Sequence, residues 1–162
     1  MPGNTTTWSP GLTAHDRALL DLVARYGVYQ DRREFDRLHE VFTDDAVFEY
    51  PVGVLNGLRE FRASLDKALF LDKGLQGWTA TRHMMNTTLV EEDGDQASGF
   101  IHVTAHHAVG SLPAPPEQVY TITGTYRDRY VRTVAGWRTR AGGLVTVTSR
   151  RLRLSATEQP WG

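Results

Sequence analysis

The first part of the chain carries apolar residues at helical spacing. Thr13 is a good N-cap, and Asp16 follows three residues later, where an acid favours a helix N-terminus. The buried stripe that predicts this first helix is Leu19, Leu22, Val23 and Tyr26. The same spacing predicts a short second helix at Glu34–Phe42 and a third helix at Gly57–Leu71, with a strand at Ala46–Tyr50 between them.

After Gly77 the pattern changes to long segments rich in Thr, Val, Tyr and Ile, which are typical of strands. The predicted strands cover residues 78 to 92, 95 to 110, 117 to 134 and 136 to 150. Short turns and one Pro-rich loop join them, which predicts an antiparallel meander. Long strands usually bend, and a bent sheet with helices on its concave side encloses a pocket. The pattern therefore predicts an α+β fold around a single pocket.

Composition limits the class of protein. The chain has 162 residues, 40% hydrophobic and 23% charged, which suits one globular domain. We expect that domain at residues 13 to 150, with a flexible arm at residues 1 to 12 and a tail at residues 151 to 162. The net charge of −1 gives no general attraction to nucleic acid or anionic lipid. The chain has no cysteine, which excludes disulfides, thiolate nucleophiles and cysteine-based metal sites. With no signal-peptide pattern or spanning segment, a cytoplasmic location is expected.

Asp31 is the first candidate functional residue. It lies near the C-terminal end of the first helix, where the helix dipole disfavours an anion. On a helical wheel it falls at the edge of the buried stripe, so it needs a cationic or hydrogen-bonding partner. In a purely structural role Asp31 pairs with Arg32 or Arg33 or points into solvent. The alternative is that it belongs to a functional site.

Two histidines are expected on inward faces of neighbouring strands. Strand alternation places His83 with Met85, Thr87 and Leu89, and His107 with Ile101, Val103 and Ala105. His102 and His106 fall on the opposite face with Phe100 and Thr104. A single histidine on an apolar face is usually a core residue. Two of them facing one cavity with a carboxylate at its wall form a set that exchanges a proton near neutral pH.

Several segments together resemble one family. They are Tyr26–Leu38 (YGVYQDRREFDRL), its continuation to Tyr50 (LHEVFTDDAVFEY), RHMMN at 82 to 86, DQA at 95 to 97, GTYRD at 124 to 128 and GWR at 136 to 138. In order and spacing these segments are similar to SnoaL-like proteins of the nuclear transport factor 2-like superfamily, over about residues 13 to 150. The resemblance implies a conical barrel formed by a strongly curved mixed or antiparallel sheet, with three N-terminal helices enclosing one deep pocket.

Within that superfamily the pattern is most similar to scytalone dehydratase. This resemblance implies that Asp31, His83 and His107 are catalytic, and that Tyr50 holds a water or the substrate carbonyl oxygen. Where the pattern has a second water-holding tyrosine this chain has Gln30, with Tyr29 beside it. Where it has a substrate-anchoring asparagine, this chain has Tyr126 and Arg127. These four residues and Asn86 are the predicted substrate-binding residues.

The implied reaction is proton abstraction next to a carbonyl group, followed by loss of a β-hydroxyl as water. It needs no cofactor and no metal, and its partner is a small aromatic or polyketide-like molecule. A polyketide cyclase or an isomerase would use the same enolate chemistry. Two histidines and an aspartate also form the ligand set of an iron site, and a non-enzymatic ligand-binding or scaffold domain is a further alternative. The open sheet face around Phe100, His102 and Thr104 suggests a homodimer or homotrimer.

Overall fold

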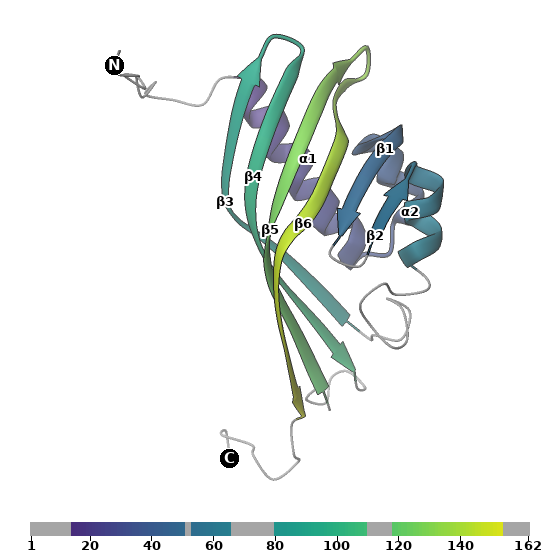
Figure 1. Ribbon diagram of the computed structural model, residues 1–162, viewed down its shortest axis with the longest axis vertical. Helices are drawn as coiled ribbons and strands as arrows, with labels where there is room; N and C mark the ends of the chain where they lie inside the picture. Colours follow the sequence, from purple (N-terminus) through teal and green to yellow (C-terminus); the bar gives the residue numbers. More distant parts are fainter. Residues whose placement is uncertain (1–13, 51–52, 66–79, 110–117, 154–162) are drawn as a thin grey trace, which may run out of the picture.

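The computed structural model describes residues 14–50, 53–65, 80–109 and 118–153 (Figure 1). Its helical elements are α1 (Ala14–Asp31), the 3-10 helix η1 (Phe35–Glu40) and α2 (Leu58–Leu65). The strands are β1 (Phe42–Tyr50), β2 (Gly53–Asn56), β3 (Ala80–Asp93), β4 (Gln96–Val109), β5 (Gln118–Thr133) and β6 (Gly136–Arg153). The predicted arm, residues 1 to 12, lies outside the described residues. Most of the predicted tail does too, although β6 continues past residue 150 to Arg153.

The strands form one sheet in the order β2-β1-β6-β5-β4-β3. All neighbouring strands are antiparallel except β1 and β6, which are parallel. The predicted α+β fold with four long consecutive strands is therefore confirmed. The order is linear over the described residues, with β2 and β3 at the two edges, so the curved sheet is not closed into a barrel.

The second helix and the strands beside it differ from the prediction. The second helix ends at Glu40 rather than Phe42, because Phe42 already begins β1 and pairs with Thr139 of β6. Strand β2 was not predicted, since four residues are too few to show a period. The predicted end of the third helix, Leu71, lies outside the described residues.

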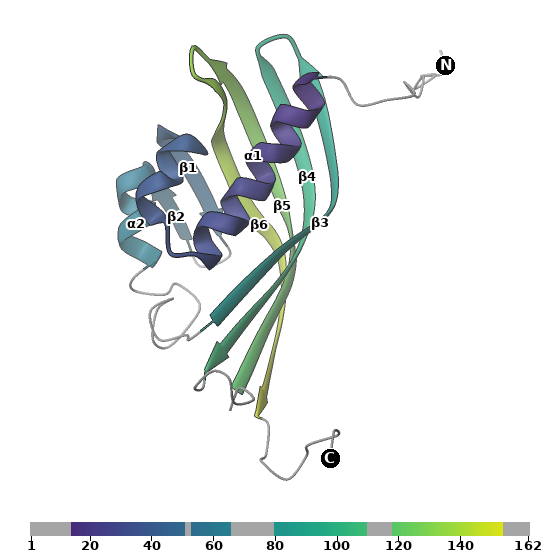
Figure 2. The same cartoon turned by 180° about the vertical axis from the view of Figure 1, so that it is seen from behind.

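The helices cover one face of the sheet. Figures 1 and 2 show the long strands bending together near their middle, with α1 lying across the face of their upper halves. β1, β2 and α2 gather beside the other end of α1. The concave side between α1 and the sheet therefore encloses the interior.

Aromatic side chains fill much of this interior. Phe42 and Phe48 from β1 meet Phe61 from α2, and the Phe48 and Phe61 rings stack with centroids 4.0 Å apart. The α1 stripe of Leu19, Leu22 and Val23 is buried against them, as the sequence pattern predicts. Burying such side chains is the main source of stability for a domain of this size.

A bulge in β3 changes which residues face inward. Pairing with β4 shifts register between Asn86 and Thr88. Because one extra residue reverses the alternation beyond it, Leu89 points away from the core and is 59% exposed. The prediction that Leu89 shares the face of His83 and Met85 is therefore wrong. On β4 the predicted inward face is confirmed, since Ile101, Val103, Ala105 and His107 are all buried.

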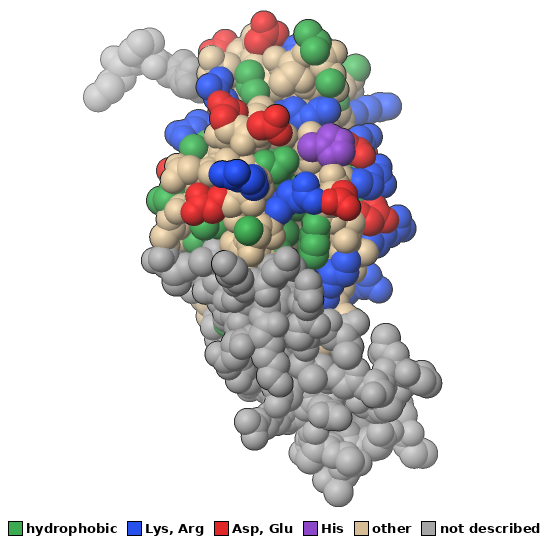
Figure 3. Space-filling model, turned by 90° about the vertical axis from the view of Figure 1, so that its right-hand side faces the viewer, with side chains coloured by type: hydrophobic (Ala, Val, Ile, Leu, Met, Phe, Trp, Pro, Cys, Tyr) green, Lys and Arg blue, Asp and Glu red, His purple; other side chains and the backbone are tan. Residues whose placement is uncertain are grey.

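The surface beside β1, β2 and α2 carries both signs of charge. Acidic and basic side chains lie next to one another across this side of the molecule (Figure 3). Arg37 pairs with Glu34 and Glu40, and Arg140 with Asp45. No helix among the described residues is long and apolar enough to cross a membrane.

Candidate functional site

The carboxylate of Asp31 binds His83. Asp31 is the last residue of α1, and its Oδ1 lies 2.8 Å from His83 Nδ1 on β3. The backbone N–H of His83 also donates to both carboxylate oxygens, at 3.1 and 3.0 Å. The helix approaches the strand closely because Gly27 has no side chain; a Cβ there would lie 3.2 Å from the His83 carbonyl oxygen. The predicted acid and the first predicted histidine thus come together.

These contacts fix the charge of Asp31 and the orientation of the His83 ring. Burial alone would raise the pKa of Asp31, but hydrogen bonds from the His83 ring, the His83 backbone and Thr81 outweigh it and lower that pKa. The carboxylate is therefore ionised at neutral pH and only accepts hydrogen bonds. Nδ1 of His83 must then carry a hydrogen, so it is Nε2 that can give up or take a proton.

Thr81 links the Asp31 carboxylate to the Arg33 guanidinium by hydrogen bonds. The Thr81 hydroxyl donates to Asp31 Oδ1 at 3.1 Å and accepts from the Arg33 guanidinium at 2.9 Å. Arg33 also donates to the Gln30 carbonyl at 3.0 Å. Its backbone has a φ of 60°, the left-handed region that is unfavourable for a residue with a Cβ. The chain therefore adopts a strained turn that brings this guanidinium to Thr81.

This strain leads to a stability prediction. Arg33→Ala and Arg33→Gly both remove the guanidinium, but only alanine retains the left-handed strain. We expect Arg33→Ala to be less stable than Arg33→Gly by about 1 kcal/mol, because glycine adopts a positive φ without steric cost. Urea unfolding of the two variants measures the difference. Equal midpoints and slopes would show that the turn is not strained.

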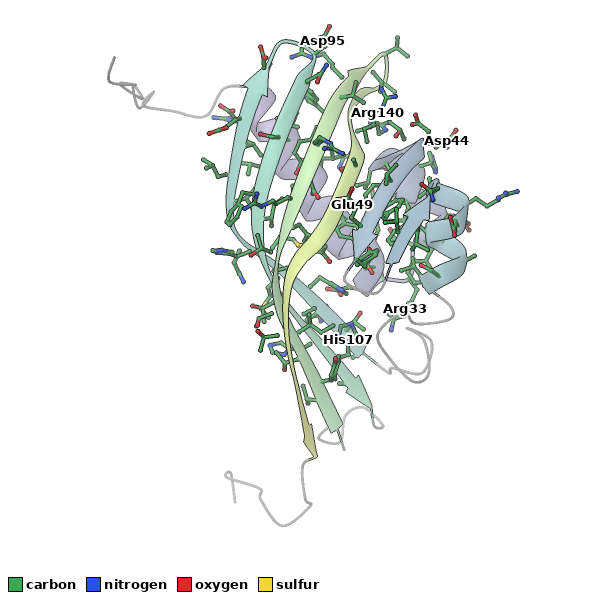
Figure 4. The ribbon with its side chains drawn as sticks, viewed as in Figure 1. Arg33, Asp44, Glu49, Asp95, His107 and Arg140 are labelled. Atoms are coloured by element: carbon green, nitrogen blue, oxygen red, sulfur yellow. The ribbon has the colours of Figure 1, made fainter. Side chains whose placement is uncertain are left out.

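His107 completes the group on the concave face. Its ring lies 5.5 Å from that of His83, centroid to centroid, and nearly perpendicular to it, at 87°. His107 is 3% exposed, and burial, followed by the charge of His83, lowers its pKa to about 4. Its ring is therefore neutral at physiological pH. Figure 4 shows His107 and Arg33 in the same lower region of the molecule.

A second polar cluster lies further along the concave face. Tyr26 of α1 hydrogen-bonds with Tyr50 of β1 and Tyr126 of β5. Burial raises the pKa of all three phenols, that of Tyr126 to about 12, so their hydroxyl groups remain protonated donors. These tyrosines and the neighbouring apolar side chains surround a cavity of about 20 Å³, room for about one water molecule.

Asp128 is a residue of this cluster that the sequence pattern did not single out. It lies two residues after Tyr126 on the same face of β5 and lines the cavity. Burial raises its pKa to about 7, while a hydrogen bond from the Tyr130 hydroxyl, at 3.2 Å from Oδ2, opposes the rise. The signal in the sequence was strand alternation, which places Tyr126, Asp128 and Tyr130 on one face.

The two clusters are separated along the sheet. His83 pairs with Ala105 of β4, whereas Tyr126 pairs with Ile101, four residues away on that strand. At about 3.3 Å per residue this is about 13 Å between backbone positions. Val103, Ala105 and Ile122 form an apolar floor between the clusters. Asp31, His83 and His107 thus form one group, and Tyr50 and Tyr126 belong to another.

Four of the five predicted substrate-binding residues do not line this cavity. Asn86 is exposed on the outer face, with its amide 3.4 Å from the Thr104 hydroxyl. Arg127 also points outward, because it alternates with Tyr126, and lies over the Phe100 ring. Tyr29 is buried under η1, where it donates to Glu40 at 2.7 Å. All three side chains therefore lie outside this cavity, and their role in substrate binding stays a prediction. Gln30 is buried beside Asp31, but it is not among the residues that line the cavity.

No group of three metal-binding side chains converges in the described ranges. Asp31 instead uses its oxygens as acceptors for His83 and Thr81. The described residues thus bring together an ionised carboxylate and two imidazoles, with a group of phenols apart from them.

The order of elements and the helix-covered curved sheet define a nuclear transport factor 2-like fold. The sequence model of the SnoaL-like domain matches residues 13–141, so the chain belongs to that family. A comparison with curated proteins gave no match.

Solved structures share the fold at low sequence identity. The Kfla4162 protein of Kribbella flavida superposes with a TM-score of 0.69 at 23% identity, over 83% of this chain and 93% of that one. A candidate scytalone dehydratase from Novosphingobium aromaticivorans gives 0.68 at 18% identity, over 86% and 89%. A hexachlorocyclohexane dehydrochlorinase, LinA type 3 from Novosphingobium barchaimii, gives 0.64 at 19% identity, over 83% and 88%. At these identities the likeness establishes the fold alone.

Proposed function

We propose that this protein is a cofactor-independent lyase that removes water from a β-hydroxy carbonyl compound of aromatic or polyketide-like structure. The observation that carries the proposal is the bond between Asp31 and His83 Nδ1, which orients the ring and leaves Nε2 as a base beside His107. The names of two structural neighbours, a dehydratase and a dehydrochlorinase, both denote elimination reactions.

In the proposed reaction His83 Nε2 takes the proton from the carbon next to the carbonyl group. The C–H electron pair forms an enolate, whose negative oxygen is stabilised by hydrogen bonds from phenols. The enolate then re-forms the carbonyl as the C–C double bond forms and the β C–O bond breaks. The leaving hydroxyl takes a proton from the imidazolium, and water departs. No electrons are gained or lost overall.

The apolar floor between the clusters favours a ring-containing substrate. The backbone positions of His83 and Tyr126 lie about 13 Å apart along the sheet, and each side chain covers part of that gap. A flat substrate on the floor of Val103, Ala105 and Ile122 would place its reacting carbon at His83, and because only the carbonyl carbon separates this atom from the oxygen, a phenol must reach towards the histidines to bind that oxygen. An apolar floor with polar groups at its ends is typical of sites for small organic ligands.

The test is turnover of a panel of bicyclic β-hydroxy ketones, followed by absorbance of the conjugated enone. We expect His83→Gln and His107→Asn each to lower the rate by at least about a hundredfold, since the first removes the base and the second removes the imidazole that lies against its ring. His106→Asn is the matched control, because His106 neighbours His107 on β4 but faces outward towards Thr121. Unchanged turnover in the first two variants would refute the dehydratase, and ring closure without loss of water would show a cyclase.

A further inference from the structure

Arg33 brings to the site a positive charge that the proposed proton transfer does not itself use. The side chain of Asp31 is 10% exposed, and a buried carboxylate draws a proton onto the nearest base unless a cation balances its charge. Arg33 supplies such a cation, because a guanidinium stays charged at every physiological pH. Its backbone φ of 60° is strained for a residue with a Cβ. Strain of this kind beside reacting groups points to a role in function.

Thr81 connects this cation to the carboxylate. Its hydroxyl accepts from the Arg33 guanidinium at 2.9 Å and donates to Asp31 Oδ1 at 3.1 Å. Thr81 is 4% exposed, so both hydrogen bonds lie where the local dielectric is low and charges act strongly. A hydroxyl that accepts from a cation becomes a stronger donor. The link therefore acts on Asp31 Oδ1, the same oxygen that binds His83 Nδ1.

We propose that Thr81 and Arg33 are positioning residues of the proposed reaction: the hydroxyl fixes Asp31 Oδ1 against His83, and the guanidinium opposes proton uptake by the two histidines. This role deepens the proposed function, on which it rests, because it names the groups that adjust the proton affinity of the acid–base site. Neither residue needs to touch the substrate to act in this way.

The electrostatic surroundings of the histidines support this role of Arg33. Burial and then the charge of His83 are the main causes that lower the pKa of His107 to about 4; the charge of Arg33 acts in the same direction, and that of Asp31 opposes it. Arg33 and His107 lie in the same region of the molecule (Figure 4). Among the described residues, the charged and titratable groups around the histidine pair are Asp31 on α1, Arg33 in the turn after it, Arg82 on β3 and Tyr120 on β5.

A second arginine near the same carboxylate provides a matched comparison. Arg82 Nη1 lies 4.0 Å from Asp31 Oδ2, but the Arg82 side chain is 79% exposed. Solvent and salt screen a charge in that position, so its removal should leave the site almost unaffected. Arg33 acts through a buried hydroxyl, where screening is weaker. The two arginines therefore separate a specific role of Arg33 from the general loss of one positive charge.

The first test is the pH dependence of kcat/KM, measured from pH 4.5 to 8.5 on the bicyclic β-hydroxy ketone of the panel that is turned over fastest. Arg33→Met removes the charge and Arg33→Lys keeps it, while both retain the Cβ in the left-handed backbone. We expect the acid limb of the profile to move to higher pH by at least about half a pH unit in Arg33→Met, because the site then takes up a proton more readily. Arg33→Lys and Arg82→Met should keep the native midpoint. A lower plateau with an unmoved midpoint would make Arg33 merely structural and overturn the proposal.

Thr81→Val tests the hydroxyl link itself. Valine has the shape of threonine but neither donates nor accepts a hydrogen bond, so Asp31 Oδ1 loses one of its donors. We expect kcat to fall about tenfold with little change in KM, since orientation rather than substrate binding is lost. Thr81→Ser restores the hydroxyl and should restore most of kcat. A fall that serine does not reverse, or that appears in KM instead, would contradict a positioning role.

NMR titration of the free protein distinguishes this proposal from the proposed reaction. The ring Cε1–H signal of His107 reports proton uptake without any substrate, and its midpoint should rise by at least about half a pH unit in Arg33→Met but not in Arg82→Met. Arg33→Gln, which keeps a donor for Thr81 without the charge, serves if Arg33→Met does not fold. If the midpoint rises and no elimination is found, the proposed reaction fails and the charge role of Arg33 stands. If elimination is found and neither the midpoint nor the acid limb moves, the role of Arg33 fails and the reaction stands.

Discussion

Replacement of Asp31 by asparagine is expected to lower kcat for the proposed elimination by about a hundredfold to ten-thousandfold, with little change in KM. The carboxylate accepts from His83 Nδ1, the His83 backbone and Thr81 at once. An asparagine must turn its NH₂ group towards one of these donors. The His83 ring then loses the partner that keeps the hydrogen on Nδ1, and Nε2 is no longer held as the base.

Steady-state kinetics of Asp31→Asn against the native chain measure this effect. Asp21→Asn is the matched control, because Asp21 lies on the same helix but is exposed and pairs only with Arg25 among the described contacts. The fall should appear in kcat, because Asp31 stabilises the charged form of His83 that arises during proton transfer. A loss confined to KM would mean that Asp31 binds substrate, and no loss would remove it from the mechanism.

Sequence periodicity was sufficient for the α+β class, for the four long strands and for the inward positions of the two histidines. The apolar stripe of α1 and the alternation along β4 are local patterns, and they placed Asp31 at the edge of the buried stripe and His107 on the inward face, as observed. The position of Leu89 was not predictable, because the bulge after Asn86 leaves no mark in the composition of β3. The separation of Tyr50 from His83 depends on the order of strands, which places three strands between β1 and β3.

The environment of Asp128 shows a second limit of sequence patterns. Alternation along β5 predicts which face of the sheet Asp128 lies on. Its pKa is raised by burial, however, and the residues that bury it lie on α1, β1 and β6, which are distant in sequence. Gly99 and Gly142 each leave space for a side chain from another strand, but the sequence around them does not indicate which side chain fills it. A buried ionisable group of this kind is recognised only when the packing around it is known.

That packing makes stability depend on pH. The pKa of Asp128 is about 7 in the folded chain, against 3.8 for an unperturbed aspartate. A folded-state pKa above the unfolded value means that the folded chain binds the proton more tightly. The stabilising contribution is therefore fully present below pH 4 and is lost progressively as the pH rises to 7. Ionisation of Asp128 is then expected to cost a few kcal/mol, at most about 4.

We therefore expect Asp128→Asn to unfold at higher urea concentration than the native chain at pH 8, by a free energy of a few kcal/mol. Near pH 4 the two should have nearly equal stability, because Asp128 is then neutral in the folded chain and the amide has a similar shape. Unfolding curves at pH 4, 6 and 8 measure the trend, with Asp44→Asn as the exposed control. The gain should grow between pH 4 and pH 7 and then level off, because no further ionisation of Asp128 follows. If Asp128→Asn instead lowered the free energy of unfolding equally at every pH, the ionised carboxylate would be well accommodated by Tyr130 and its neighbours. Its burial would then not destabilise the folded chain.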